Sequence, residues 1–311
     1  RDDTANWARA AAAVAPDRVT VIAKEHNAGK RHALYTGFQL VKTPLVVTVD
    51  SDTVLPPDAL RTLVTPMVLD ARVGAVAGRI DVLNRGRNLL TRMLAVRYRI
   101  GFDFSRAYQS ELGSVFVTPG AFSCYRVDVV RPQWDAWRDI RFLGANCSNG
   151  DDHHMANRVL WAGFKTVYQS NAVAQTTVPV TYKRLALMYL RWARSNIRES
   201  TLYMMNVPKI VGSVRRWPAI IDATFSFLQL PLRMYLLFAG WMLIVMHPTL
   251  LLRSIAFALM FALVHMIFFL RSERSFDAIY TLAYAVFALL TLQWIYPAAL
   301  ITVRQSRWLT R

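Results

Sequence analysis

The sequence predicts an α/β domain followed by membrane-associated helices, and three observations support this. Over residues 1–180, short apolar runs bounded by turn residues alternate with helical patterns. Residues 217–303 are almost uncharged and rich in Leu, Ala, Phe and Met. Hydrophobic residues make up 54% of the 311-residue chain, which exceeds the roughly 45–50% of soluble domains. We therefore expect a soluble-type domain first and apolar helices after it.

The elements of the first region form a β-α-β-α-β alternation, which implies a parallel sheet with right-handed crossovers. The clearest strand is Leu45–Val49, a run of five β-favouring residues. A polar turn at residues 27–32 opens a helix that is suited to meeting an anion. The helix that this turn opens is expected to run through Gln39. The other expected elements are helices at 5–14, 58–69, 88–109, 155–162 and 181–204, strands at 18–23, 73–77 and 164–168, and a turn at Pro119-Gly120.

The net charge of +17 first suggests a nucleic-acid partner. Many of the arginines, however, flank the apolar segments, which is typical of cytoplasmic membrane flanks and of attraction to anionic lipid. The chain has no zinc-ligand spacing and no aromatic-basic RNA motif. We therefore expect a lipid bilayer and no nucleic acid. With only Cys124 and Cys147, no disulfide framework is expected, which suits a reducing, cytosolic face. Because the chain begins at Arg1 without Met, we expect it to be the interior of a longer protein.

The helix expected at 181–204 places four arginines within an arc of roughly 80°. Two interpretations remain open: a helix lying on the membrane surface or the charged solvent face of a globular helix. The four are Arg184, Arg191, Arg194 and Arg198.

Three apolar segments follow, at 219–246, 249–270 and 278–303, and each reaches the roughly 20 residues that cross a bilayer. The uncharged link after the first segment is expected outside and the basic link at 271–274 in the cytosol. A third crossing would place the basic tail outside. We therefore expect the third segment to be interfacial or re-entrant.

Asp50 and Asp52 directly follow the strand at Leu45–Val49. Ligands bind beyond the carboxyl ends of such strands, and paired carboxylates there suit a divalent cation on a substrate's phosphates. An acidic turn without a ligand is the alternative for this pair taken alone.

Asp151 and Asp152 form a second acidic turn before a helix, where they are either capping residues or include a general base for an acceptor hydroxyl. A metal site at His153 and His154 is disfavoured, since adjacent helical residues point in different directions. Arg191-Trp192 offers a guanidinium for phosphate and an indole for a sugar face. A lipid-interface Trp beside a basic stripe is the alternative.

In this order, these motifs resemble the processive, inverting family 2 glycosyltransferases. The likeness is greatest to hyaluronan synthases and nodulation-type chitooligosaccharide synthases, with chitin and cellulose synthases further off. The matching stretches are 27–34, 49–53, 88–92, 119–126, 150–152, 191–192 and 306–311.

The resemblance implies a GT-A nucleotide-sugar domain at 1–180 with its N-terminal part missing. An interfacial region at 181–216, transmembrane or interfacial helices at 217–303 and a gating segment at 304–311 would follow. By the same resemblance, Asp52 and Asp50 would hold Mg²⁺ or Mn²⁺, and Asp152 would be the base, supported by Asp151. The other implied contacts are Lys30 to the uridine, Asp50 and Arg191 to the donor diphosphate, Trp192 and Gly120 to the acceptor, and Trp308, Thr310 and Arg311 to UDP through the gating loop.

The implied function is a multi-pass enzyme of the plasma membrane, with its catalytic domain in the cytoplasm. It would extend and export a hyaluronan- or chitin-like polysaccharide from UDP-GlcNAc, UDP-GlcA or both. Three positions depart from the family pattern: Met188 stands where Gln is usual, His153 where Arg is common and Leu309 where Gly is common. These three departures concern the identity of the acceptor and of the polymer. The two alternatives are a single-transfer enzyme that glycosylates a membrane lipid and a catalytically silent membrane scaffold.

Overall fold

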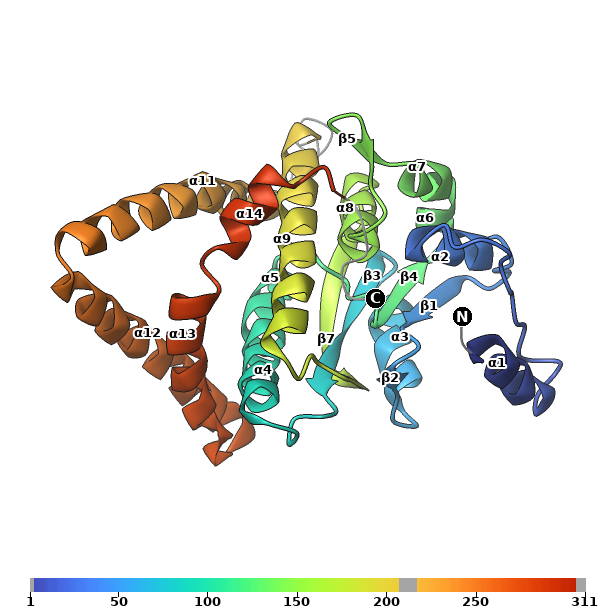
Figure 1. The fold of residues 1–311 in the computed structure, drawn as a ribbon. Coiled ribbons are helices and arrows are strands. Elements are labelled where there is room, and N and C mark those ends of the chain that lie inside the picture. The colour runs from blue at the N-terminus through green and yellow to red at the C-terminus, as the bar shows by residue number, and fades with distance from the viewer. Residues whose placement is uncertain (1–2, 207–216, 306–311) are drawn as a thin grey trace. The chain divides into compact units, whose positions relative to one another are not determined.

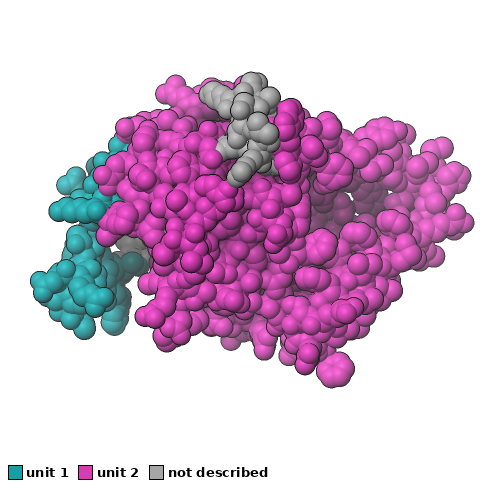
Figure 2. Space-filling view, turned by 180° about the vertical axis from the view of Figure 1, so that it is seen from behind, with its two compact units in different colours: residues 1–42 teal, residues 43–311 magenta. Residues whose placement is uncertain are grey.

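The computed structural model describes residues 3–206 and 217–305. The chain divides into two compact units, residues 1–42 and 43–311 (Figure 2). The first unit contains helices α1 (Thr4–Ala13) and α2 (Lys30–Phe38). The prediction of a strand at 18–23 is wrong, since these residues form no strand. The described part of this unit holds no strand with which they could pair.

The second unit contains a mixed α/β domain and the apolar helices (Figure 1). Its strands are β1 (Leu45–Val49), β2 (Thr53–Val54), β3 (Val73–Val82), β4 (Phe122–Arg126), β5 (Arg141–Phe142), β6 (Ala145–Asn146) and β7 (Lys165–Thr176). Its helices before the apolar region are α3 (Ala59–Leu69), α4 (Leu89–Ile100), the π-helix η1 (Gly101–Arg106), α5 (Ala107–Glu111), α6 (Val127–Val130), η2 (Arg131–Gln133), α7 (Trp134–Arg138), α8 (Asp151–Trp161) and α9 (Tyr182–Met205).

The main sheet has the order β1-β4-β3-β7-β2. The expectation of a wholly parallel sheet is wrong, since only β3 and β7 pair in parallel. Strand β4 runs antiparallel to both of its neighbours, β1 and β3. The chain leaves β3 through α4, η1 and α5 and returns between the two earlier strands. The antiparallel pairing of β4 depends on where the chain re-enters the sheet, and the order of helices and strands in the sequence does not determine that place.

The core of the domain packs α3 against β3, β4 and β7, through Leu63, Met67, Val76, Ile80 and Phe122, each 3% exposed or less. The helix expected at 88–109 forms, but it contains a π-helical segment between α4 and α5. Strand β7 extends the run expected at 164–168 by eight residues, to Thr176.

Helix α9 matches its expected bounds within one residue, and its arginine stripe faces solvent only in part, since Arg184 is exposed. Arg194 is 3% exposed and Arg198 is 1% exposed. The opposite side, with Leu190, Ala193 and Ile197, packs against α14 (Ile295–Ile301). Buried guanidinium groups need partners, and α9 finds them in the domain and in the segment after α14. Its placement at a bilayer surface stays a prediction.

The apolar region begins with two long helices, α11 (Trp217–Met246) and α12 (Thr249–Glu273), which form a hairpin beside the domain (Figure 1). Both are long and apolar enough to cross a membrane. The third segment is η4 (Phe276–Ile279), α13 (Tyr280–Thr291) and α14, with a bend of 47° at the break before α14. The bend suits a broken span or a re-entrant loop, and the choice between them stays a prediction.

The described chain returns to α9 after the bend. Arg194 donates hydrogen bonds from Nε to Thr302 Oγ1 at 2.9 Å and from Nη2 to Gln305 Oε1 at 3.0 Å. Residues 302–305 therefore lie against the helix that carries Arg191 and Trp192.

Candidate active site

The predicted metal-binding turn lies at the carboxyl end of β1. Asp50 directly follows Val49, and its carbonyl accepts a hydrogen bond from the Thr53 N–H at 3.0 Å, which closes a tight turn before β2. Asp50 is half-buried and Asp52 is exposed. The turn thus presents one carboxylate to solvent and holds the other near the end of the strand.

Antiparallel pairing brings the Pro119-Gly120 turn beside the first turn. Val49 pairs with Phe122, so the residues after Val49 lie next to those before Phe122. The turn is closed by a hydrogen bond from the Phe122 N–H to the Pro119 carbonyl, at 3.0 Å. Two distant stretches of sequence thereby share one edge of the sheet.

The predicted base contacts this second turn directly. The Gly120 N–H donates to Asp152 Oδ2 at 3.3 Å, and the His153 N–H donates to Oδ1 at 2.9 Å. The buried Thr118 hydroxyl lies 3.3 Å from the Asp152 carbonyl and 2.8 Å from the Tyr125 hydroxyl. Each carboxylate oxygen of Asp152 thus receives one N–H and keeps capacity to accept a hydroxyl proton.

The acidic turn enters α8 through Gly150, whose φ of 76° is left-handed. A Cβ there would collide with the Ser195 hydroxyl of α9, so the position needs glycine for space as well as for its backbone. The helix expected from residue 155 already begins at Asp151, which places both carboxylates in its first turn, where they suit the helix dipole. Asp151 is buried, and its carbonyl accepts from the Trp137 indole at 2.9 Å.

Beneath this turn lies a buried polar network that connects α8 to α9. Arg198 Nη2 donates to the Asn149 carbonyl at 2.5 Å and to Asn149 Oδ1 at 2.8 Å. The Arg158 Nε–H donates to His154 Nε2 at 2.9 Å, which leaves the imidazole proton on Nδ1, 2.7 Å from Glu199 Oε2. The disfavoured metal site at His153 and His154 gains no support, since both side chains are buried and His154 is already engaged.

Two groups in this network have displaced pKa values. Burial would raise the pKa of Glu199, but the contact with His154 and the charge of Arg198 lower it to about 2. Burial lowers the pKa of His153 to about 4, although the charge of Glu199 acts in the opposite direction. The folded state therefore favours the ionised form of Glu199 and the neutral form of His153, which are the forms present near neutral pH.

Arg191 lies among the predicted catalytic carboxylates. Burial lowers the pKa of its guanidinium, while the charges of Asp152, Asp151 and Asp50 act to raise it. The arginine predicted to bind the diphosphate is therefore within electrostatic reach of both acidic turns.

Trp192 lies beside Arg191 and is 44% exposed. Its ring centroid is 6.2 Å from that of Tyr98 and 5.6 Å from that of Tyr189. Burial raises the pKa of Tyr98, and the charges of Arg191 and Asp52 act on it in opposite directions, which places the tyrosine at the same site. The aromatic group offers an apolar face next to the charged one.

The remaining predicted contacts lie in other parts of the chain. Lys30 is the first residue of α2, in the unit of residues 1–42. Its helix opens after Gly29, whose N–H donates to Asn27 Oδ1 at 2.9 Å, so the polar turn forms as expected. Trp308, Thr310 and Arg311 lie outside the described residues.

The two acidic residues after β1 were predicted to hold a cation. Among residues 3–206 and 217–305, no group of three or more His, Cys, Asp and Glu side chains is arranged to hold a metal. Asp50 and Asp52 supply two hard oxygen donors on one tight turn, and diphosphate and water oxygens are the usual remaining ligands of Mg²⁺. The donor set therefore suits Mg²⁺ or Mn²⁺ held jointly with a nucleotide.

Sequence reasoning missed Tyr98, Thr118, Arg106 and the Arg198–Glu199 pair. The pair did carry a signal, because Arg191, Arg194 and Arg198 repeat at helical spacing on a helix that is apolar on the other side. Such a stripe can face either solvent or buried acidic residues, and the sequence alone does not distinguish the two. The fold shows which of them the arginines face.

The sequence itself is related to a family of known proteins. The model of a family described as "Glycosyltransferase like family 2" matches residues 1–195, which is more than half of the chain. The chain belongs to glycosyltransferase family 2.

This family 2 glycosyltransferase is similar to hyaluronan synthases. It is 38% identical to one from Streptococcus pyogenes over 187 residues, covering 60% of this chain and 43% of the relative. It is 34% identical to hyaluronan synthase 3 of Homo sapiens over 173 residues, covering 55% of this chain and 31% of the relative. The chain thus spans less than half the length of either relative.

A solved structure confirms the GT-A fold expected for this glycosyltransferase. It is the mannosyltransferase PcManGT from Pyrobaculum calidifontis in complex with GDP-Man and Mn²⁺, with a TM-score of 0.54 and 18% sequence identity. The likeness covers 99% of this chain and 76% of that one.

The low pKa of His153 predicts a pH dependence of stability. Its folded-state pKa lies below the unfolded value of 6.5, so the unfolded chain takes up a proton first. This contribution to stability is complete above pH 6.5 and is lost as the pH falls to about 4, by roughly 1–3 kcal/mol. We expect His153→Gln to flatten the dependence of the unfolding midpoint on pH between 7 and 4.5, measured by thermal unfolding in detergent. His26→Gln, at an exposed position, should keep the wild-type slope. Equal slopes in the His153 variant and the wild type would contradict the assignment.

Proposed function

We propose that the enzyme is a membrane-embedded, inverting β-glycosyltransferase that uses a UDP-sugar to extend a hyaluronan- or chitin-like polysaccharide processively. One observation carries the proposal. The turn with Asp50 and Asp52 and the carboxylate of Asp152 lie at one edge of the sheet, and the guanidinium of Arg191 is within electrostatic reach of Asp50 and Asp152. A donor diphosphate and an acceptor hydroxyl need this combination of groups.

Asp152 would act as the general base. Its two hydrogen bonds, from the Gly120 and His153 N–H groups, orient the carboxylate without neutralising it. The carboxylate would accept the proton of the acceptor hydroxyl as that oxygen attacks the anomeric carbon of the donor from the face opposite UDP. Attack from that face inverts an α-linked donor into a β-linkage. Asp151 would support the turn from its buried position, through the Trp137 contact.

The leaving group would be stabilised by positive charge at the sheet edge. Arg191 would bind the diphosphate oxygens, a role that a planar guanidinium suits. Mg²⁺ or Mn²⁺, held by Asp50 and Asp52, would neutralise charge on the departing UDP. Trp192 and its aromatic neighbours would hold a sugar face of the acceptor.

Membrane placement and the gating tail are part of the proposal. The hairpin of α11 and α12 supplies two candidate spans, and the bend before α14 brings residues 302–305 back to α9. A tail that continues from this point on the catalytic side could reach bound UDP, as the gating role of Trp308, Thr310 and Arg311 requires. The catalytic domain would then face the cytoplasm at the plasma membrane.

The proposed reaction predicts a long polymer. Membranes containing the full-length protein should convert UDP-GlcNAc, UDP-GlcA or both into products of high molecular mass and release UDP in proportion. Size fractionation of radiolabelled product, with each donor alone and with both, is the measurement. A product of one sugar on an extractable lipid would indicate the single-transfer alternative, and no UDP release with any donor would indicate the silent scaffold.

Asp152→Asn should separate chemistry from binding. Loss of a positioned base lowers turnover by about 10²–10⁴-fold, whereas UDP affinity should stay within about twofold because the donor contacts remain. Turnover and UDP affinity by calorimetry are the measurements. Asp58→Asn, at an exposed site before α3, is the matched control and should behave as wild type. A collapse of UDP binding in the Asp152 variant would assign this residue to the donor site instead.

Asp52→Asn should abolish the metal dependence of UDP binding, because it removes a charged oxygen donor from a hard cation. Titration of UDP with Mn²⁺ and with EDTA should differ strongly for the wild type and little for the variant. Asp128→Asn, at an exposed position of α6, should keep the wild-type difference. Should EDTA weaken UDP binding equally in the variant and the wild type, Asp52 is not a ligand.

A further inference from the structure

Arg106 is a half-buried cation next to the site, and the proposed reaction gives it no role. It is the last residue of the π-helix η1. Its guanidinium lies 3.9 Å from the centroid of the buried Phe102 ring, and its Nε–H donates to the Val117 carbonyl at 3.2 Å. The stacking fixes the plane of the guanidinium, and the hydrogen bond fixes its direction.

The contact with Val117 bears on the base because the next residues of the chain reach Asp152. Thr118 lies within 3.3 Å of the Asp152 carbonyl through its hydroxyl, and Gly120 donates its N–H to the Asp152 carboxylate. Residues 117–120 therefore lie between Arg106 and Asp152. A shift of this segment would move the N–H that orients the proposed base.

Charge supports the same spatial relation. Burial lowers the pKa of Arg106 to about 10, while the negative charge of Asp152 is among those that act to raise it. The guanidinium is therefore held against a desolvation cost, and its geometry is maintained by the surrounding structure.

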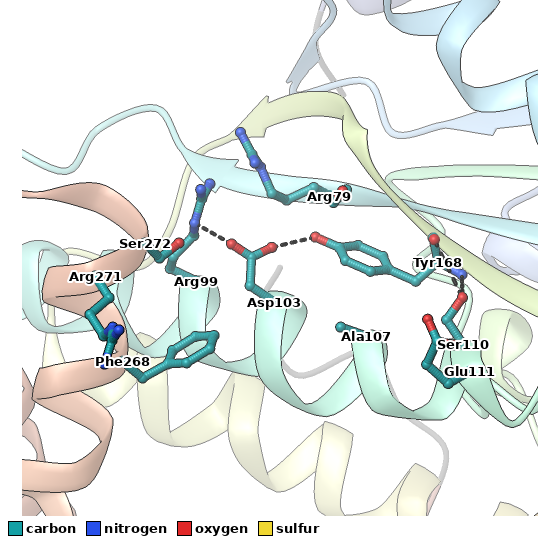
Figure 3. A pocket seen from close by; sticks show the side chains of 11 residues that line it. Arg79, Arg99, Asp103, Ala107, Ser110, Glu111, Tyr168, Phe268, Arg271 and Ser272 are labelled. Carbon is teal, nitrogen blue, oxygen red and sulfur yellow. Dashed lines mark hydrogen bonds and ion pairs between the residues drawn. The ribbon is translucent and has the colours of Figure 1, made fainter.

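Asp103, on the same π-helix as Arg106, forms polar contacts with two neighbouring side chains (Figure 3). Asp103 forms an ion pair with Arg99 Nε at 2.5 Å and accepts a hydrogen bond from the Tyr168 hydroxyl at 2.7 Å, beside a cavity of about 670 Å³. Arg99 also pairs with Glu273 at the end of α12. π-Helical segments re-aim side chains relative to a regular helix. In η1, Asp103 contacts this ionic cluster, whereas Arg106 contacts the Val117 carbonyl.

We propose that Arg106 is a positioning residue for the general base. By holding the Val117 carbonyl, its guanidinium fixes residues 117–120 and thereby the Gly120 N–H that orients Asp152. The inference rests on the proposed function of Asp152 as the base. In this role Arg106 acts through residues 117–120 and Asp152.

Single variants test the kinetic signature. Arg106→Gln should lower kcat by about 10–100-fold, the usual cost of a misplaced catalytic group, with UDP affinity within about twofold. Arg106→Lys should remain within about threefold of the Gln variant, since an ammonium keeps the charge but lacks the planar Nε–H donor. Full activity of the Lys variant, or a loss of UDP affinity equal to the loss in kcat, would overturn the proposal. Arg61→Gln, on an exposed part of α3, is the control and should match the wild type.

A double-variant cycle separates positioning from general damage. In the Asp152→Asn background, Arg106→Gln should change kcat by less than about twofold, because residues that act as a unit are not additive. A second loss of the full 10–100-fold would show that Arg106 acts independently of Asp152, and would overturn the inference. Should Arg106→Gln fail to fold, Thr118→Val tests the same segment and should give the same pattern, a kcat loss that disappears in the Asp152→Asn background.

The two proposals fail in different ways. Wild-type turnover of Asp152→Asn alone would refute the role of Asp152. A large loss in that variant, combined with an additive effect of Arg106→Gln, would refute only the positioning role.

Discussion

The candidate site depends on one buried interaction, the hydrogen bonds of Arg198 to the backbone and side chain of Asn149. They join α9 to the turn that carries the two acids. Arg198 and Glu199 are almost completely buried, at 1% and 0% exposed. Breaking a buried pair of this kind typically costs about 3–5 kcal/mol because the remaining charge is left without compensation. Arg198 lies two helical turns after Arg191 on α9. Its hydrogen bonds to Asn149 therefore hold the acidic turn at a fixed distance from Arg191.

The elements that sequence predicted well are those whose pattern is local. Helix α3 and helix α9 follow from apolar periodicity, and the strand β1 from a run of β-favouring residues that ends in carboxylates. The strand expected at 18–23 has the right composition, but a strand also needs a neighbour. The antiparallel insertion of β4 depends on where a long connection returns, and the π-helix interrupts a helical pattern that continues unchanged through residues 101–106. Neither has a signature in the order of residue types.

The same division holds for the site. Asp50, Asp152 and Arg191 were predicted from motifs, and in the fold the charges of both acids act on the Arg191 guanidinium. Tyr98 and Arg106 were not predicted, since a tyrosine or an arginine in a long amphipathic helix has nothing local to distinguish it from a surface residue. Their contacts with Trp192 and Val117 arise from chain segments far away in sequence. The roles of Lys30 and of the tail stay predictions.

The domain and the apolar hairpin are joined by polar contacts at both helices. Tyr108 of α5 donates to Asp222 near the start of α11, and Arg99 of α4 pairs with Glu273 at the end of α12. Both contacts lie on the continuous helical segment that contains η1. The hairpin is thus attached to the element beside the base, which gives the apolar helices a structural connection to the chemistry.

The packing of α14 on α9 has a consequence for how the enzyme is made. Leu190, Ala193 and Ile197 are covered by residues that are synthesised much later in the chain. Ile140, Phe142 and Cys147 of the same cluster precede the strip in the chain, but its contacts with Ile295 and Ala299 form only after the hairpin and the bent helices have been synthesised. Until that packing forms, the nascent domain would present part of an apolar surface to chaperones or to the bilayer.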